Sequence, residues 1–177
     1  MKLLFISLGC DKNLVDSEEM LGMLAADGHE IVDDEDEAEV IIVNTCCFIG
    51  DAKEESVNTI LEMAEKKKAG TCKVLIVTGC MAQRYKKEIS EEIPEVDAIL
   101  GTTSYGDISK AVRKQAGRHF EEYKSIDFLP DISGKRMLTT GGHFAYLKIA
   151  EGCDKHCTYC IIPRLRGGYR SVLWSSS

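Results

Sequence analysis

Three cysteines stand close together in one short stretch of the sequence. Cys153, Cys157 and Cys160 form a C-x3-C-x2-C array that follows an apolar run over residues 144–149 and a glycine. Three thiolates in one tight loop can face a single point, and soft thiolate ligands select zinc, copper(I) or iron–sulfur clusters. Because a [4Fe–4S] cluster usually has four cysteine ligands, three local cysteines would leave one iron open to a substrate or cofactor. We call these three residues the loop set.

A structural zinc site is the main alternative for this stretch. Zinc sites often use C-x2–4-C spacings, and His156 could complete a set of three cysteines and one histidine. However, His156 is directly adjacent to Cys157, so the two side chains would have difficulty converging on one ion. The spacing therefore favours a site of three thiolates, with zinc as the competing interpretation.

The cysteine content and the N-terminus indicate the compartment. The chain has 177 residues, eight cysteines and a formal net charge of −7. Eight cysteines suggest disulfides in a secreted protein, but metal or redox chemistry in a cytosolic one. The apolar run over residues 3–8 is shorter than a signal-peptide core, and no stretch reaches the ~20 apolar residues of a membrane span. We therefore expect a cytoplasmic protein with reduced thiols and no membrane partner, whose acidic charge argues against a nucleic-acid surface on this portion.

Apolar runs alternate with stretches of helical periodicity through the first part of the chain. Strands are expected at residues 3–8, 29–32, 40–43, 74–77 and 97–100. Helices are expected between them, with Asn13 or Asp16 capping the first and a capping box at Asp51 and Glu54 opening the second. Two later helices are expected over residues 81–92 and 105–115. Strands that alternate with helices predict an α/β fold with a doubly wound parallel sheet.

The sequence divides into three parts. Residues 1–117 carry the alternating pattern and should form the α/β domain, whereas residues 118–142 lose the periodicity and contain Pro130 and several glycines. We interpret residues 118–142 as an interdomain connection, with short strands at most. Residues 143–177 begin a new unit, in which a strand over residues 144–149 delivers the loop set.

A second group of three cysteines follows from the predicted sheet. Cys10, Cys46 and Cys80 each lie just beyond the carboxyl end of a predicted strand, and the carboxyl ends of parallel strands form the edge where ligands bind. The same geometry excludes Cys72, which precedes its strand, and Cys47, which should point away from Cys46. Buried cysteine is also a common small apolar residue, but three at equivalent places favour a second metal site. We call these three residues the strand-end set.

The two cysteine sets together resemble a known family. A C-x3-C-x2-C array after a strand is similar to the signature of radical S-adenosylmethionine enzymes, and residues 150–163 followed by Arg166-Gly167 resemble the methylthiotransferase branch. Gly9-Cys10, Asn44-Thr45-Cys46 and Gly79-Cys80 are similar to the N-terminal motifs of that branch. The match covers nearly the whole chain, from Leu3 to about Ser171.

A finer resemblance concerns the substrate. The string over residues 7–18, Ser-Leu-Gly-Cys-Asp-Lys-Asn-Leu-Val-Asp-Ser-Glu, resembles the enzymes that modify an aspartate of a small-subunit ribosomal protein. The tRNA-modifying relatives typically have Gln-Met-Asn after the first Gly-Cys. The resemblance thus implies a ribosomal-protein substrate, and tRNA is the less favoured partner.

The resemblance also implies the cofactors and the reaction. Two [4Fe–4S] clusters would be held by the two cysteine sets, and S-adenosyl-L-methionine would bind at the open iron of the loop set. The reaction would replace a C–H bond at the aspartate β-carbon with C–SCH3, since such cofactors carry the chemistry that side chains cannot. An electron donor such as flavodoxin or ferredoxin and a sulfur donor would be needed, and no acid–base side chain is assigned a catalytic role.

The family's radical S-adenosylmethionine core is a large α/β barrel, of which this sequence carries only the first strand and the cysteine loop. The tail over residues 172–177 does not continue the family pattern, as in a truncation, a frameshift or a cloning scar. We therefore expect this chain alone to bind iron–sulfur at the strand-end set, to bind it more loosely at the loop set, and not to turn over. The competing classes are a tRNA-modifying relative and a non-catalytic iron–sulfur or zinc module.

Overall fold

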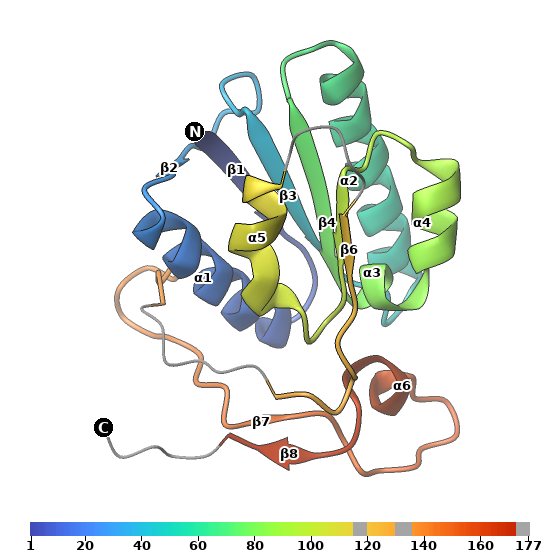
Figure 1. Cartoon of the computed structure of the whole chain (residues 1–177). Coiled ribbons are helices and arrows are strands. Elements are labelled where there is room, and N and C mark those ends of the chain that lie inside the picture. Colours follow the sequence, from blue (N-terminus) through green and yellow to red (C-terminus); the bar gives the residue numbers. More distant parts are fainter. Residues whose placement is uncertain (115–119, 130–135, 173–177) are drawn as a thin grey trace.

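The computed structural model describes residues 1–114, 120–129 and 136–172, and its main feature is a parallel sheet (Figure 1). The six strands lie in the order β2-β1-β3-β4-β5-β6, and every neighbouring pair is parallel. Their bounds are β1 Lys2–Ser7, β2 Glu30–Ile31, β3 Val40–Thr45, β4 Val74–Gly79, β5 Ala98–Leu100 and β6 Phe120–Glu122. Because all the strands run the same way, all their carboxyl ends meet at one edge. The predicted α/β fold with a doubly wound parallel sheet is confirmed.

Helices cover both faces of this sheet, as its two-sided apolar strands require. One face packs against α1 (Asp11–Ala26), the 3-10 turn η1 (Tyr105–Asp107) and α5 (Ile108–Arg113), through Met20, Leu24 and Ile108. The other face packs against α2 (Gly50–Lys68), α3 (Cys80–Arg84) and α4 (Lys86–Glu92), through Ile60, Met63 and Ile89. Successive β3 residues alternate between the two cores, with Val40 and Ile42 in one and Ile41 and Val43 in the other.

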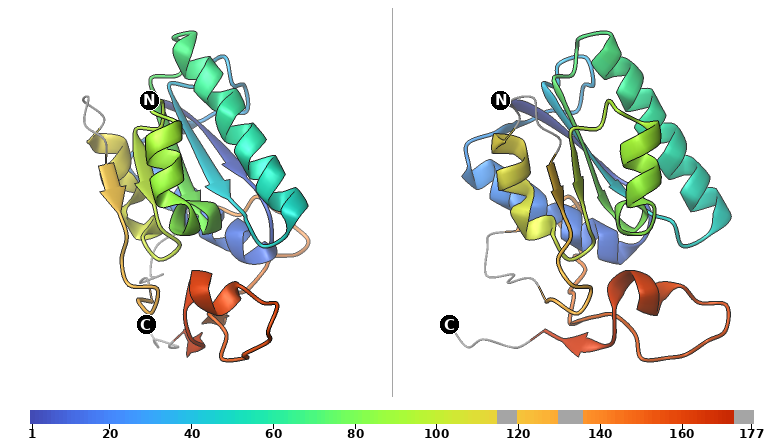
Figure 2. Two further views of the ribbon diagram at one scale, coloured as in Figure 1. Left: turned by 90° about the vertical axis from the view of Figure 1, so that its right-hand side faces the viewer. Right: turned by 45° about the vertical axis from the view of Figure 1, so that its right-hand side comes forward.

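A small second unit lies against the carboxyl-end edge of the sheet (Figure 2). It contains the antiparallel pair β7 (Ala150–Glu151) and β8 (Arg170–Ser171), with the short helix α6 (Ile162–Arg166) between them. The chain from 152 to 160 forms the loop that carries three of the cysteines. The unit is joined to the sheet by buried contacts as well as by the chain, for example the hydrogen bond from Thr102 Oγ1 to the Leu165 carbonyl, 2.8 Å.

Several expected elements differ from the observed ones. The helix expected over residues 81–92 is split into α3 and α4 at Tyr85 (φ −116°, ψ 33°). The helix expected over 105–115 ends in the described part at Arg113, and residues 115–117 lie outside the described residues. The strand expected over residues 144–149 is extended chain without strand pairing, and only Ala150 and Glu151 pair. Since its apolar side chains are mostly exposed, this run has no core in the described chain to pack against.

The expected caps are also wrong. Cys10 is the N-cap residue of α1 and Ile49 that of α2, and neither helix start has a side-chain capping hydrogen bond. Asn13 and Asp16 instead lie inside α1, where both are buried. Asn13 and Asp16 therefore do not cap α1, and their side chains instead bond to residues near the cysteines, as described below.

Strand β6 falls within residues 118–142, the segment interpreted as a connection, and extends the sheet beside β5. None of the helices in the described ranges is long and apolar enough to cross a membrane.

Candidate metal centre

The strand-end set lies at the carboxyl ends of three strands that are neighbours in the sheet. β1, β3 and β4 are adjacent, and their last residues are in register, with Ser7 opposite Asn44 and Thr45 opposite Gly79. Cys10 is exposed at the start of α1, whereas Cys46 and Cys80 are buried, at 5% and 4% exposure. The structure therefore brings all three residues to one edge, as the strand pattern predicts.

The turn before Cys10 packs directly against Cys46. Gly9 has a φ of +94°, and a Cβ added there would lie 2.5 Å from the Cys46 Cβ and 2.8 Å from its Sγ. Glycine is the residue that tolerates both this conformation and this close approach. The Gly-Cys pair is thus needed for the first turn to reach the neighbouring strand end.

Asn13 ties the three strand ends together. Its side-chain amide donates hydrogen bonds of 2.9 Å to the Leu8 carbonyl, ahead of Cys10, and to the Thr45 carbonyl, ahead of Cys46. Its Oδ1 lies 3.9 Å from the Cys80 Sγ. Asn13 is fully buried, so these bonds are made away from water.

The backbone of Cys46 is held from the other side of the sheet. The Ser56 hydroxyl, on α2, accepts a hydrogen bond from the Cys46 amide at 3.0 Å and donates one to the Cys46 carbonyl at 2.8 Å. One buried hydroxyl therefore satisfies both polar groups of a residue that follows the end of its strand.

The loop set lies in the second unit. Cys153 and Cys160 are half-buried and Cys157 is exposed. The Cys153 amide donates to the Gly167 carbonyl at 3.1 Å, and the Cys160 amide donates to the Cys157 carbonyl at 3.1 Å. Gly152, just before the loop, has a φ of +77°, and a Cβ added there would overlap the Gly168 carbonyl oxygen. The loop is consequently anchored at its base, next to the residues that follow α6.

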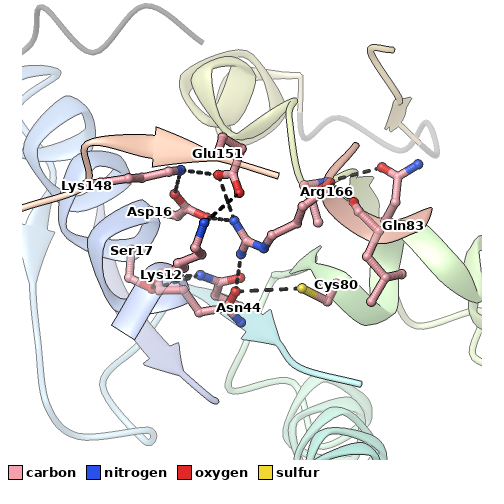
Figure 3. A network of polar contacts seen from close by, with 12 residues as sticks. Lys12, Asp16, Ser17, Asn44, Cys80, Gln83, Lys148, Glu151 and Arg166 are labelled. Atoms are coloured by element: carbon pink, nitrogen blue, oxygen red, sulfur yellow. Dashed lines mark hydrogen bonds and ion pairs between the residues drawn. The ribbon is translucent and has the colours of Figure 1, made fainter. Parts of the chain in front are cut away.

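A buried ion network joins this loop base to the sheet edge (Figure 3). The Arg166 guanidinium donates to Asp16 at 3.0 Å, to Glu151 at 2.9 Å and to Asn13 Oδ1 at 2.5 Å. Lys148 lies 2.5 Å from both Asp16 and Glu151. Lys12 approaches Glu151 from the solvent side at 3.5 Å.

The network controls the ionisation of its members. Burial alone would raise the pKa of Glu151, but the charges of Arg166 and Lys148 lower it to about 2. Burial also opposes the charge of Lys148, yet Asp16 and Glu151 raise its pKa above the usual value. Burial raises the pKa of the Cys80 thiol to about 12, although the charge of Arg166 and a hydrogen bond from it act in the opposite direction. Arg166 therefore favours the thiolate of Cys80, and burial favours the neutral thiol.

Sequence reasoning missed this network. In the sequence, Arg166 and Glu151 are parts of motifs, and Asn13 and Asp16 are motif positions and expected helix caps. The one available signal was that charged residues flank a cysteine loop directly, with Glu151 two positions before Cys153. Arg166, however, is separated by 150 residues from Asp16 and by 153 from Asn13, which no local pattern reveals.

The two excluded cysteines behave differently from each other. Cys72 precedes β4, at the opposite edge of the sheet, and its thiol donates to the Val74 carbonyl at 3.1 Å. Cys47, expected to point away from Cys46, is buried in the apolar cluster on the α2 side of the sheet, which does not include Cys46. Burial raises the pKa of Cys47, and the thiols of Cys47 and Cys46 both act on the pKa of Cys80. The carboxyl-end edge therefore holds a fourth thiol near the strand-end set.

A cleft of about 510 Å³ lies where the loop meets the α/β domain. Phe48 and Arg84 line it from the domain, and Cys157, Cys160 and Arg164 line it from the second unit. Two thiols of the loop set thus face a space that is shared with the α/β domain.

Both sets consist of cysteines, whose thiolates are the ligands that iron–sulfur clusters use and that zinc also accepts. All eight cysteines are described, and all are free of disulfides. Among the residues that the structure describes, no three Cys, His, Asp or Glu side chains converge closely enough to hold a single ion.

Fold and site together define an open α/β domain with one three-cysteine set at the carboxyl-end edge of its sheet and a second set in the small unit that lies against that edge. The family described as "Uncharacterized protein family UPF0004" matches residues 2–101. The chain therefore belongs to this family, and the curated relatives that match it include ribosomal protein uS12 methylthiotransferases named RimO.

These relatives match almost the whole chain. The chain is 64% identical over 173 residues to the ribosomal protein uS12 methylthiotransferase RimO of Lachnoclostridium phytofermentans. This alignment covers 97% of this chain and 39% of that relative. The proteins of the same name from Clostridioides difficile and Geobacter sulfurreducens are 52% and 50% identical, over 97% and 96% of this chain and 39% and 38% of their own lengths. The chain thus spans about 39% of the length of the relatives it matches. The family resemblance stated from the sequence is confirmed.

Proposed function

We propose that the chain forms the cluster-bearing part of a radical S-adenosylmethionine methylthiotransferase that acts on an aspartate of ribosomal protein uS12. The observation that carries this proposal is the position of the two cysteine sets. One set follows three adjacent parallel strands, and the other is fastened above the same edge by a buried ion network. Two sites that must exchange a sulfur group have to lie close together, and this arrangement supports that requirement.

In this proposal Cys10, Cys46 and Cys80 hold one [4Fe–4S] cluster, and Cys153, Cys157 and Cys160 hold another. When bound, the clusters and S-adenosylmethionine supply the electron, the radical and the methylthio group that convert C–H into C–SCH3. The protein's own residues orient the cysteines and shield them from water. Asn13 and Ser56 fix the backbone around Cys10 and Cys46, and the Gly167 carbonyl fixes the start of the loop.

The partners follow from the same proposal. The substrate is the ribosomal protein that the relatives' name states, and an electron donor such as flavodoxin or ferredoxin and a sulfur donor supply the remaining inputs. The reaction would take place in the cytoplasm, where thiols stay reduced. Because the chain spans about 39% of its relatives' length, we propose that it provides the cluster sites and does not methylthiolate uS12 by itself.

The test is anaerobic reconstitution with iron and sulfide, followed by analysis of iron, sulfide and zinc. We expect about eight irons per chain, and about four in a variant with Cys10, Cys46 and Cys80 changed to alanine or in one with Cys153, Cys157 and Cys160 changed. A Cys72→Ala variant is the matched control, since Cys72 lies at the opposite edge, and it should keep all eight.

The competing function is a structural zinc module, which would purify colourless. Zinc retained in place of iron and sulfide after reconstitution would overturn the proposal in favour of that module. A tRNA-modifying activity would instead leave the iron result intact, and incubation of the full-length relative with uS12 and with tRNA in separate reactions distinguishes the two substrates.

A further inference from the structure

Arg166 touches both cysteine-bearing parts of the molecule. Its side chain is buried to 2% exposure, and it comes from the end of α6, six residues after Cys160. From there it bonds to Glu151, which is two residues before Cys153, and to Asp16 and Asn13, which lie within α1, just after Cys10. One side chain therefore spans the loop base and the sheet edge.

Asn13 extends this contact to the strand-end set. The same amide group that accepts from Arg166 donates to the carbonyls of Leu8 and Thr45, and its oxygen faces the Cys80 Sγ. A chain of three buried side chains, Asn13, Arg166 and Glu151, thus connects the backbone before Cys10 and Cys46 with the backbone before Cys153.

The charges of the network are matched inside the protein. Asp16 and Glu151 face Arg166 and Lys148, and all four side chains are at most 5% exposed. A buried ion that loses its partner is strongly destabilising. Separating the second unit from the α/β domain would leave Asp16 without Arg166 and Lys148, so this ion network favours the packed arrangement of the two units. An arginine is needed, because its planar fork can serve two carboxylates and an amide at once, whereas a lysine is a single point of charge.

We propose that Arg166, acting through Asn13, is a positioning residue that holds the loop set and the strand-end set in one fixed arrangement and closes the edge over Cys46 and Cys80. The inference rests on the proposed function for its purpose, since two clusters would need that arrangement. The contacts themselves exist in the chain without any cluster.

The test measures thiol labelling of the cluster-free chain under reducing, native conditions, with each cysteine followed by mass spectrometry. Removing the guanidinium in Arg166→Gln should open the edge and raise the labelling rates of Cys46 and Cys80 about tenfold, because buried thiols react through local opening. Cys72 is the internal reference, since it is equally buried but lies at the other edge. Its rate should stay within about twofold of the parent.

Arg136→Gln is the matched control variant. Arg136 pairs with Glu18, which is fully buried, so this change also removes the cation from a buried carboxylate. It should not raise Cys46 and Cys80 labelling over that of Cys72. Arg166→Lys, which keeps the charge, should restore protection only in part.

Three results would overturn the inference. They are equal acceleration of Cys46, Cys80 and Cys72 in Arg166→Gln, no acceleration of any of them, and the same selective pattern in Arg136→Gln. If Arg166→Gln does not fold, the labelling rates of Cys46 and Cys80 in Arg166→Lys are compared with that of Cys72 instead. Failure of the proposed function has a different signature, because a chain that takes up no iron and sulfide can still show the selective labelling.

Discussion

At the scale of single residues, the stability of the fold should depend strongly on the side-chain amide of Asn13. Its amide nitrogen donates to the buried Thr45 carbonyl and to the half-buried Leu8 carbonyl, and its oxygen accepts from Arg166. An aspartate would have nearly the same shape and would keep the acceptor for Arg166. It would lose the donor, however, and place a carboxylate oxygen against the carbonyls of Leu8 and Thr45.

We expect Asn13→Asp to lower the free energy of unfolding by about 1–3 kcal/mol for each buried carbonyl left without a donor. The measurement is urea unfolding of the cluster-free chain at pH 7. Asn58→Asp makes the same chemical change on the exposed side of α2, and it should stay within about 0.5 kcal/mol of the parent. Equal effects of the two changes would show that the Asn13 amide contributes nothing specific.

At the scale of elements, α1 is connected to the segment after residue 135 through Glu18. The Glu18 carboxylate is fully buried, and it accepts hydrogen bonds from the Thr139 amide at 2.7 Å, from the Thr139 hydroxyl at 2.9 Å and from Arg136. Burial alone would raise the pKa of Glu18, but the bonds from Thr139 and Arg136 lower it below 4.5. The folded state therefore favours the ionised form.

A folded-state pKa below the unfolded value means that the stabilisation is complete above about pH 4.5 and is lost as the pH falls through the folded pKa. Glu18→Gln should therefore lower the free energy of unfolding at pH 7, by roughly 1–3 kcal/mol. The gap between parent and variant should narrow as the pH is lowered below about 4.5. The measurement is the urea midpoint of parent and variant at several pH values from 7 to 3. Glu62→Gln, on the exposed side of α2, is the control. A gap that widens towards low pH would contradict the assignment.

The elements of the α/β domain could be predicted because their signals are local. Continuous apolar runs such as Val40–Val43 and Val74–Val77 are buried on both faces, and the residue after such a strand is placed at the ligand edge by topology alone. That reasoning located the strand-end set. It also separated Cys72 from that edge. Burial of Cys47 in the apolar cluster beneath α2 depends on the path of the chain into that helix, which strand topology does not specify.

The contacts between units could not be predicted in the same way. The run over residues 144–149 has the composition of a strand, but pairing depends on a neighbouring strand that its own sequence does not specify. Asp16 and Arg166 are separated by 150 residues, and each reads locally as an ordinary charged position on a helix. The ion network is a property of the folded arrangement, so only the structure reveals it.

At the scale of the whole molecule, the two cysteine sets differ in how firmly the protein holds them. The strand-end set follows strands at the centre of the sheet, and two of its three thiols are buried. The loop set belongs to a small unit with one exposed and two half-buried thiols. A ligand bound to the first set would stabilise the central strands, whereas a ligand bound to the second would stabilise mainly the loop.

Reconstitution should therefore raise the melting temperature, and most of the rise should depend on the strand-end set. Binding to the native state alone shifts the unfolding equilibrium, and each kcal/mol corresponds to about 2–4 °C for a chain of this size. The measurement is anaerobic thermal unfolding by circular dichroism of the apo and reconstituted forms. The parent is compared with a Cys10/Cys46/Cys80→Ser variant and a Cys153/Cys157/Cys160→Ser variant. The second variant should keep more than half of the parent's rise and the first should lose most of it. Equal losses in both would mean that the buried network couples the loop to the sheet so tightly that the two sites stabilise the fold as one.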